Sequence, residues 1–417
     1  MRDVRLTISA DAWRGVQKLL HDHQRFLVAK IRWRATRSGS EALVDVAHIM
    51  AEVPRGGDRP PLDDFLVIGV ENSERLASSA VELMRRVRPQ SSQAAITLVL
   101  STTTLGHWDG AVSLEGKIDS LGGFRITGPG PVEVSQQAPL AEHDSTGLFS
   151  RLRGAVGETV YQRLRRAVVV QIGASRNGAL CAQMLASLGI ARLRLCDGDL
   201  LQPENLDGMP GVSRGSIGRP KAEAVADTIL RARDDLAVTC GNYSVLSPEA
   251  AALFGESCDL VVTCVDDDAA RVAAGLLAKK MNVAHLDIAT SVSNRPTLPH
   301  AIIGDSRLFL PRHGCCACTP PLTPEERESI LYRLAAPPNT LQRGTMPAWS
   351  EQRAGSLITI NAATVSAGIG SWLDLLAGTL RTSFWQRLDW IPGEGLRLNS
   401  AAVDAAKECP FCKVGEQ

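Results

Sequence analysis

Three groups of side chains in this sequence have types and spacings suited to chemistry: a glycine-rich turn, a set of polar groups, and two cysteine pairs. The turn holds Gly173, Ser175 and Gly178. The polar groups that follow it are Asp197, Asp199, Asn205, Lys221 and Asp266. The pairs are Cys315 with Cys318 and Cys409 with Cys412. These residue types favour a bound phosphate, a hard cation such as Mg²⁺, and a tetrahedral Zn²⁺ ion.

The glycine turn lies between a predicted strand and a predicted helix. The apolar, β-branched run Val168 to Ile172 predicts the strand, and helical spacing of apolar residues beyond Gly178 predicts the helix. Gly173 allows a sharp exit from the strand, and free N–H groups at the helix start favour a phosphate. A second apolar run ends in Asp197, where a βαβ nucleotide-binding unit has a carboxylate that accepts hydrogen bonds from a ribose. The unit is therefore predicted to bind a nucleotide.

The middle position of the turn is Ser175, where a dinucleotide fingerprint has a second glycine. That glycine normally lets the backbone approach a pyrophosphate closely, so the serine argues against an NAD site and favours a mononucleotide. A G-x-S-x-x-G pattern alone is a weak signal. An NAD(P)-dependent oxidoreductase therefore stays open as an alternative.

Three further motifs follow the turn in order. They are DGDLLQPENL from Asp197 to Leu206, GRPKA from Gly218 to Ala222, and VVTCVDDDAAR from Val261 to Arg271. Together with the turn they resemble the ubiquitin-activating-enzyme superfamily, the ThiF/MoeB-like adenylyltransferases, whose pattern is a glycine-rich turn, D-x-D-x-V-x-x-S-N-L-x-R, G-x-x-K-A and T-D-N-x-x-x-R. The resemblance covers about Phe149 to Cys412. It implies an α/β fold, with a doubly wound, Rossmann-like adenylation domain over residues 146–417.

The resemblance implies ATP-dependent adenylation. In this family the C-terminal glycine carboxylate of a ubiquitin-like protein attacks the α-phosphorus of ATP, which gives an acyl-adenylate and pyrophosphate. Such a transfer depends on positioning and on positive charge around the phosphate oxygens. The roles that the resemblance implies are ribose binding for Asp197, phosphate binding for Asn205 and Lys221, and Mg²⁺ binding for Asp266. Asp199 and Asp267 stay open between site residues and solvated charges at strand ends.

One departure from the family pattern removes a positive charge. The family arginine two residues after N-L is Gly208 here, and Arg176 or Arg214 could supply the missing charge. Relatives with G-x-G-R-x-G turns favour Arg176. An arginine upstream of the first strand reaches the ATP phosphates in this family, often across a dimer interface, and Arg151 matches it best. Without such charges adenylation would be slow or lost, so a catalytically dead scaffold is another alternative.

The two Cys-x-x-Cys pairs have the arrangement of a structural Zn²⁺ site with four thiolates. The gap between the pairs exceeds that of a zinc ribbon, but ThiF/MoeB-like enzymes have this separation. Cys316 is then an odd thiol. Family members that form a thioester keep a cysteine in the crossover segment, here Thr319 to Ser356, which contains none. Either Cys316 is the nucleophile, or the adenylate passes directly to its acceptor.

The overall charge is balanced, with 45 Lys and Arg against 45 Asp and Glu, so no net field would recruit nucleic acid or an anionic membrane. Charged residues interrupt the first apolar residues, which predicts no secretory signal. Cysteine pairs without such a signal favour metal over disulfides and a cytoplasmic protein. The long apolar stretch Leu357 to Leu380 contains Asn361 and Asp374, and predicts a buried helix rather than a membrane span.

Residues 1–140 are predicted to form a separate α+β domain, followed by a polar linker at Val132 to Ser145. The predicted elements are a helix at Asp11 to Asp22, strands at Phe26 to Ala35, Ala42 to His48 and Asp64 to Val70, a helix at Glu74 to Arg86, and a strand at Ala95 to Leu100. This order resembles a JAB/MPN isopeptidase domain. Ser101 to Thr104 replace the H-x-H-P metal motif of that family, which implies a degenerate, inactive domain that serves as a scaffold or recognises a protein.

The whole sequence predicts a ubiquitin-like-protein activating enzyme of bacterial type. By analogy it would serve a conjugation pathway of the Bil antiphage-defence kind, with a ubiquitin-like protein and a conjugating enzyme as partners, and would form a homodimer. The extra N-terminal domain favours conjugation over the sulfur-carrier pathways for thiamine or molybdopterin, which are the nearest alternative. The expected cofactors are ATP, Mg²⁺ and Zn²⁺.

Overall fold

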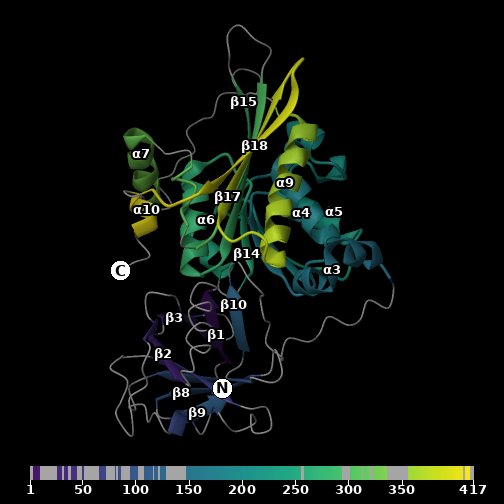
Figure 1. Ribbon diagram of the computed structural model, residues 1–417. Helices are drawn as coiled ribbons and strands as arrows, with labels where there is room; N and C mark the ends of the chain where they lie inside the picture. The colour runs from purple at the N-terminus through teal and green to yellow at the C-terminus, as the bar shows by residue number, and fades with distance from the viewer. Residues whose placement is uncertain are drawn as a thin grey trace. The chain divides into compact units, whose positions relative to one another are not determined.

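In a computed structural model the chain forms two compact units, Met1–Glu142 and His143–Gln417 (Figure 1). In the second unit the structure describes residues 147–254, 258–293, 301–311, 313–319, 323–335, 356–406 and 409–413. In the first unit it describes the strands given below and residues 80, 83–85, 94 and 115. The helix expected at 11–22, the motif position 102–104 and the linker expected at 132–145 lie outside the described residues.

An eight-stranded sheet forms the centre of the second unit. Its strand order is β13-β12-β11-β14-β15-β16-β17-β18. The strands are β11 (Val168–Ile172), β12 (Arg192–Cys196), β13 (Ala237–Gly241), β14 (Leu260–Thr263), β15 (Ala284–Ser293), β16 (Ala301–Phe309), β17 (Ser383–Ile391) and β18 (Gly395–Val403). The strands from β13 to β15 pair in parallel, and those from β15 to β18 pair antiparallel. Apolar runs such as that of β11 are typical of parallel strands covered on both faces.

Helices cover both faces of this sheet (Figure 1). One face carries α3 (Ser150–Leu164), α4 (Arg176–Ser187), α5 (Lys221–Leu230) and α9 (Ile358–Ala377), and the other carries α6 (Asp268–Lys280). Trp372 of α9 is fully buried in the first core, and Ala274 of α6 in the second. The predictions of a doubly wound α/β domain and of a helix in the stretch 357–380 are confirmed. Among the described residues no helix combines the length and apolarity needed to cross a membrane.

The spatial order of the strands reverses beside β11. From β11 the chain passes through β12 to β13 at the sheet edge, and then returns to β14 on the other side of β11. In open α/β sheets, ligands bind at such a reversal, outside the carboxyl ends of the strands. The loops that follow β11 and β14 meet at this point, and they carry Gly173 and Asp266.

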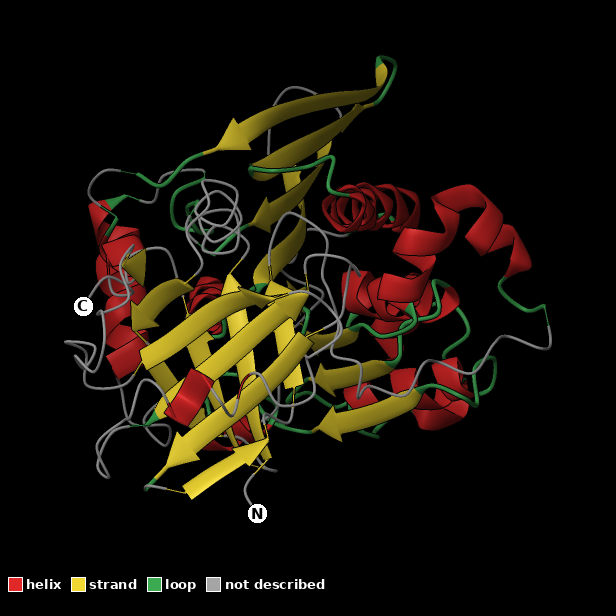
Figure 2. Ribbon diagram, turned by 60° about the horizontal axis from the view of Figure 1, so that its bottom comes forward, coloured by secondary structure: helices red, strands yellow, loops and turns green. Residues whose placement is uncertain are grey.

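The described residues of the first unit are mainly strands, drawn yellow in Figure 2. A four-stranded sheet has the order β10-β1-β4-β3, and a six-stranded sheet has the order β5-β2-β6-β7-β8-β9. The strands are β1 (Asp3–Ser9), β2 (Phe26–Lys30), β3 (Arg32–Ala35), β4 (Gly39–Val44), β5 (Ile49–Met50), β6 (Phe65–Glu71), β7 (Ala95–Ser101), β8 (Trp108–Leu114), β9 (Lys117–Ser120) and β10 (Gly123–Thr127).

The prediction of one strand from Phe26 to Ala35 is wrong. The structure has two strands here, β2 and β3, and they belong to different sheets. The residues of β2 are an apolar run, whereas those of β3 alternate arginine with apolar residues. The two segments therefore suit different surroundings, a strand covered on both faces and a strand with one polar face.

A buried polar network joins β14, β15 and β16. Asp287 is fully buried, and its carboxylate accepts hydrogen bonds from Arg307 Nη2 at 2.5 Å and from Thr263 Oγ1 at 2.6 Å. Thr263 Oγ1 also lies 2.8 Å from Nε2 of His285. Burial raises the pKa of Asp287, but the charges of Arg307 and Arg271 outweigh burial and hold it at about 2. Burial lowers the pKa of His285 to about 4.

Acid is expected to destabilise the second unit through His285. Its folded pKa of about 4 lies below the ordinary value of 6.5, so stability that is present above pH 6.5 is lost as the pH falls toward 4. One imidazole contributes a slope of at most about 1.4 kcal/mol per pH unit. Urea unfolding of the His285→Gln variant should therefore depend less on pH in this window than unfolding of the wild type. Equal slopes would contradict the assignment.

Candidate functional site

The turn after β11 is fixed by contacts on both sides. Gly173 has a φ of 97°, and a Cβ there would overlap the backbone carbonyl of Cys264 in the loop after β14. A Cβ at Gly178 would overlap the carbonyl of Gly173. The fully buried side chain of Gln171 donates to the carbonyls of Gly173 and Gly178, at 2.9 and 2.8 Å. Only glycine fits these two positions, because a side chain at 173 would push the turn away from the loop that leads to Asp266, and a side chain at 178 would push the helix start away from the turn.

The turn leads directly into helix α4, for which Ser175 is the N-cap residue. The serine is extended, and its side chain makes no capping hydrogen bond to the helix. The first N–H groups of a helix have no partner within the helix and favour a negative charge. The geometry predicted for a phosphate is therefore present at Ser175 and Gly178.

The carboxylate of Asp197 lies between the turn and the segment that follows β12. Its Oδ2 accepts the N–H of Ala174 at 2.8 Å, and its Oδ1 accepts the N–H of Asp199 at 2.8 Å. Burial raises the pKa of Asp197, and the positive charge of Lys221 partly opposes this effect. Each carboxylate oxygen has two lone pairs, so Asp197 can still accept hydrogen bonds from ribose hydroxyls.

Lys221 is the first residue of α5 and is buried beside these carboxylates. Its Nζ lies 3.0 Å from Oδ2 of Asp199, and its backbone N–H donates to the Asp199 carbonyl at 2.9 Å. Asp199 is therefore an ion-pair partner of Lys221 rather than an unpaired solvated charge. The pair holds the ammonium close to Asp197, where a phosphate can compete with Asp199 for it.

Asn205 lies in the short 3₁₀ helix η3 (Pro203–Gly208) and is buried. Its Oδ1 accepts the backbone N–H of Gln202 at 2.9 Å, as part of a capping box. This contact uses the acceptor of the amide and leaves Nδ2, a donor, as the group that can bind a phosphate oxygen.

Arg176 and Gly208 are in direct steric contact. A Cβ at Gly208 would lie 2.5 Å from Cγ and 2.9 Å from Cδ of Arg176. The guanidinium forms an ion pair with Asp207 at 2.6 Å, and it donates to the Ser356 hydroxyl and the Glu204 carbonyl, both at 3.0 Å. The side chain of Arg176 thus occupies the space into which a side chain at 208 would begin, and it brings a positive charge there.

The three consecutive aspartates after β14 have different surroundings. Asp267 caps α6 and makes two contacts of 2.6 Å with Arg333, and Asp268 pairs with Arg271 at 2.7 Å. Asp267 is therefore a structural residue rather than a solvated charge. Asp266 is exposed, and no hydrogen bond or ion pair from the described residues reaches it. Its carboxylate is thus available as an oxygen ligand for a hard cation.

Arg151 and Arg214 are not brought to this group within one chain. Both are exposed, and among the described contacts no hydrogen bond or ion pair joins either of them to the residues around the turn. Arg151 lies in the first turn of α3. A role across a dimer interface, as the family resemblance implies for Arg151, is compatible with this exposure.

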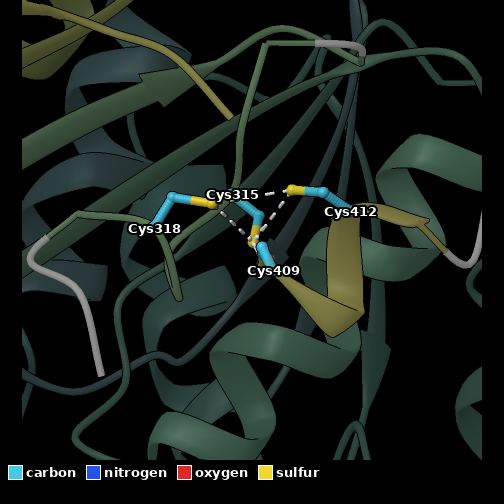
Figure 3. Close-up of side chains that lie close together, drawn as sticks. All are labelled: Cys315, Cys318, Cys409 and Cys412. Atoms are coloured by element: carbon cyan, nitrogen blue, oxygen red, sulfur yellow. Dashed lines mark hydrogen bonds between the residues drawn. The ribbon is translucent and has the colours of Figure 1, made fainter. Parts of the chain in front are cut away.

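The four paired cysteines converge on one point, with their sulfur atoms turned toward one another (Figure 3). Four of the Sγ–Sγ distances are between 3.6 and 3.8 Å, and all four atoms lie within 4.8 Å of one another. Zinc bound to four thiolates at 2.3 Å in a tetrahedron requires separations of roughly 3.8 Å. The cluster of Cys315, Cys318, Cys409 and Cys412, hereafter the cysteine cluster, therefore fits Zn²⁺.

The cysteines of this chain are all buried or half-buried. Cys316 is buried next to the cysteine cluster. All ten cysteines of the sequence lie among the described residues, and none of them is exposed. Cys316 is thus not an accessible thiol, whereas Cys240 and Cys412 are half-buried.

Several residues that the motifs did not reveal shape this region: Gln171, Asp287, Arg307, Arg333 and Lys279. The signal for the first two was a polar residue within an apolar run, because a buried polar group needs a partner. No comparable signal exists for Arg333 and Lys279. Their partners are 66 and 133 residues away in the sequence.

The profile of the ThiF family matches residues 149–374. The chain belongs to the ThiF family. This ThiF-family chain is 26% identical over 225 residues to ubiquitin-like modifier-activating enzyme 5 of Caenorhabditis elegans, an alignment that covers 50% of this chain and 51% of the relative. It is 34% identical over 122 residues to molybdopterin-synthase adenylyltransferase of Escherichia coli, covering 29% of this chain and 49% of that relative. The resemblance inferred from the motifs is thus confirmed for the family.

This ThiF-family chain spans about half the length of the curated relatives it matches. Among solved structures, that of Escherichia coli MccB with ATP is similar with a TM-score of 0.47 and 16% identity, covering 66% of this chain and 76% of MccB.

Replacing Gly208 by alanine is expected to displace Arg176, because the new Cβ would overlap its side chain. Overpacking of this kind costs about 1–3 kcal/mol of unfolding free energy. Urea unfolding measures the loss, and Gly215→Ala is the matched control because a Cβ there has its nearest neighbour at 3.5 Å. A Gly208→Ala variant as stable as the Gly215→Ala variant would contradict the described contact.

Protein purified without chelators is expected to contain about one zinc ion per chain, measured by elemental analysis. Cys409→Ser should lower that content and destabilise the second unit, since metal binding in such sites is coupled to folding. The buried Cys258, which lies in a different core, gives the control variant Cys258→Ser. Protein without bound zinc would exclude the four-cysteine assignment.

Proposed function

We propose that this protein is an ATP-dependent adenylyltransferase that activates the C-terminal carboxylate of a ubiquitin-like protein. Membership of the ThiF family supports this proposal, as do relatives named as an activating enzyme and as an adenylyltransferase. The observation that carries it is the buried Lys221 ammonium beside Asp197 and the glycine turn, at the strand reversal next to β11. A cation, a ribose acceptor and free N–H groups at one place suit a nucleoside triphosphate.

Each group has a distinct part in the reaction. The carboxylate oxygen of the substrate forms a bond to the α-phosphorus of ATP, the bond from that phosphorus to the bridging oxygen breaks, and pyrophosphate leaves with the electron pair. Lys221, the amide of Asn205 and the guanidinium of Arg176 would bind phosphate oxygens and oppose their developing charge. Asp197 would hold the ribose, and Asp266 would bind Mg²⁺, which neutralises phosphate charge when bound.

The proposal extends to the pathway and the partner proteins. We place the protein in a bacterial conjugation pathway of the Bil antiphage-defence kind, as a cytoplasmic homodimer with a ubiquitin-like substrate. Since no cysteine is exposed, the conjugating enzyme or another acceptor would take the acyl group directly from the adenylate. Residues 1–140 would serve as an inactive JAB/MPN-like recognition domain.

Activation of a sulfur carrier is a second candidate function. The absence of an exposed cysteine favours it, because a sulfur-carrier adenylate needs no thioester on the activating chain. The relative with the higher identity, 34%, is molybdopterin-synthase adenylyltransferase. Membership of the ThiF family removes the support for an NAD(P)-dependent oxidoreductase. The arginine at 176 lies where the family arginine at 208 is missing, which argues against a catalytically dead scaffold.

Exchange of labelled pyrophosphate into ATP tests the proposed function, with Mg²⁺ and a panel of ubiquitin-like and sulfur-carrier proteins that end in glycine. We expect exchange with one member of the panel. The variants Lys221→Ala and Asp266→Ala should each reduce it about 100-fold, the typical effect of removing one group that stabilises transition-state charge.

Asp268→Ala is the matched control for Asp266→Ala, because it removes a neighbouring carboxylate that pairs with Arg271 instead. It should retain exchange within a few-fold. Exchange that is equally fast in the Lys221→Ala and Asp266→Ala variants would refute the assigned roles. Absence of ATP binding by calorimetry would refute the adenylation proposal itself.

A further inference from the structure

Lys279 contacts the cysteine cluster from outside the set of four sulfur atoms. It lies in the last turn of α6, and its Nζ donates to Sγ of Cys412 at 3.1 Å. The two residues are 133 positions apart in the sequence, so local chain geometry does not bring them together. Lys280, the next residue, is exposed, and no described contact joins it to the cluster.

The surroundings of the cysteine cluster require a positive charge. Four thiolates around one divalent cation carry a net charge of −2. Apolar side chains pack around the cluster, among them Phe309, Ile330, Val403 and Phe411. Charge in apolar surroundings is costly unless it is paired and hydrogen-bonded. The backbone N–H of Ala406, which lies 3.4 Å from Sγ of Cys318, is a neutral donor and leaves the charge unbalanced.

A helix dipole alone explains a lysine at the end of α6, but not this contact. The last turn of a helix carries partial negative charge, which lysines stabilise wherever they point. Lys279 and Lys280 would both serve that purpose. Only Lys279 is half-buried with its ammonium at a sulfur atom, whereas Lys280 is exposed and has no described contact with the cluster. The helix dipole therefore does not explain why the ammonium of Lys279 lies at the Cys412 sulfur.

We propose that Lys279 is an outer-sphere part of the metal centre. Its ammonium makes a charge-assisted hydrogen bond to the Cys412 thiolate, which lowers the net negative charge of the loaded site. The same bond engages a sulfur lone pair and makes Cys412 a poorer nucleophile toward alkylating or oxidising agents. Cys412 is the most exposed of the four cysteines, so it is the one that needs this protection. The proposal depends on the metal site and not on adenylation.

The test uses the full chain, purified with zinc, as the wild type and the variants Lys279→Met, Lys279→Arg and Lys280→Met. Excess iodoacetamide is added, and released zinc is followed with a chromogenic chelator. Peptide mass spectrometry at early times identifies the cysteine that reacts first. We expect the Lys279→Met variant to release zinc about tenfold faster than the wild type, as for loss of other outer-shell partners of metal ligands. In that variant Cys412 should be the first cysteine alkylated.

Lys279→Arg, which keeps a charged donor, and Lys280→Met, which removes a lysine from the same helix end, should both release zinc at the wild-type rate. Equal rates in Lys279→Met and Lys280→Met would overturn the proposal, as would first alkylation elsewhere in the cluster. If the Lys279→Met variant does not fold, Lys279→Gln supplies the same comparison with a neutral donor, and a wild-type rate there is the overturning result. Protein that binds no zinc overturns the proposal directly.

Discussion

The close packing of two loops at the strand reversal is the constraint on which the rest of the second unit depends. The turn after β11 and the loop after β14 approach so closely that only glycine fits at position 173, against the carbonyl of Cys264. Two hydrogen bonds stabilise the turn: the Gln171 side chain donates to the Gly173 carbonyl, and the Asp197 carboxylate accepts the N–H of Ala174. The turn that leads into α4 and the loop that leads to Asp266 therefore lie in close contact at one edge of the sheet.

Helix α6 connects this edge to the cysteine cluster. At its N-terminus, Asp267 is bound by Arg333 from α7 (Pro324–Ala335), and at its C-terminal end Lys279 reaches Cys412 of α10 (Pro410–Lys413). The two ends of the helix thus contact α7, which follows Cys318 in the sequence, and α10, which contains Cys412. A metal in the cluster would stabilise the C-terminal end of α6, and the N-terminal end of the same helix follows the loop that carries Asp266.

The sequence was sufficient for the features that follow from local patterns. The apolar run of β11 predicted a strand of the sheet, and the glycines after it predicted the turn, since each depends on residues that are close in sequence. The two Cys-x-x-Cys spacings predicted the convergence of the four cysteines. The separation of β2 from β3 was missed because the sequence between these two short strands carries no turn signal. The network of Asp287 with Arg307 and the contact of Lys279 with Cys412 were also missed. They join elements whose proximity is a result of sheet order, which no single-sequence pattern encodes.

The shared space of Arg176 and position 208 also bears on how such a site can change over generations. A long side chain at 208 and an arginine at 176 would exclude each other, while small residues at both would leave the phosphate edge without that charge. A change from arginine at 208 to arginine at 176 by single substitutions therefore passes through one of two intermediates. One has long side chains at both positions, which overlap, and the other has an arginine at neither. Related sequences are expected to have arginine at one of the two positions and a small residue at the other, and the residues at 176 and 208 should change together.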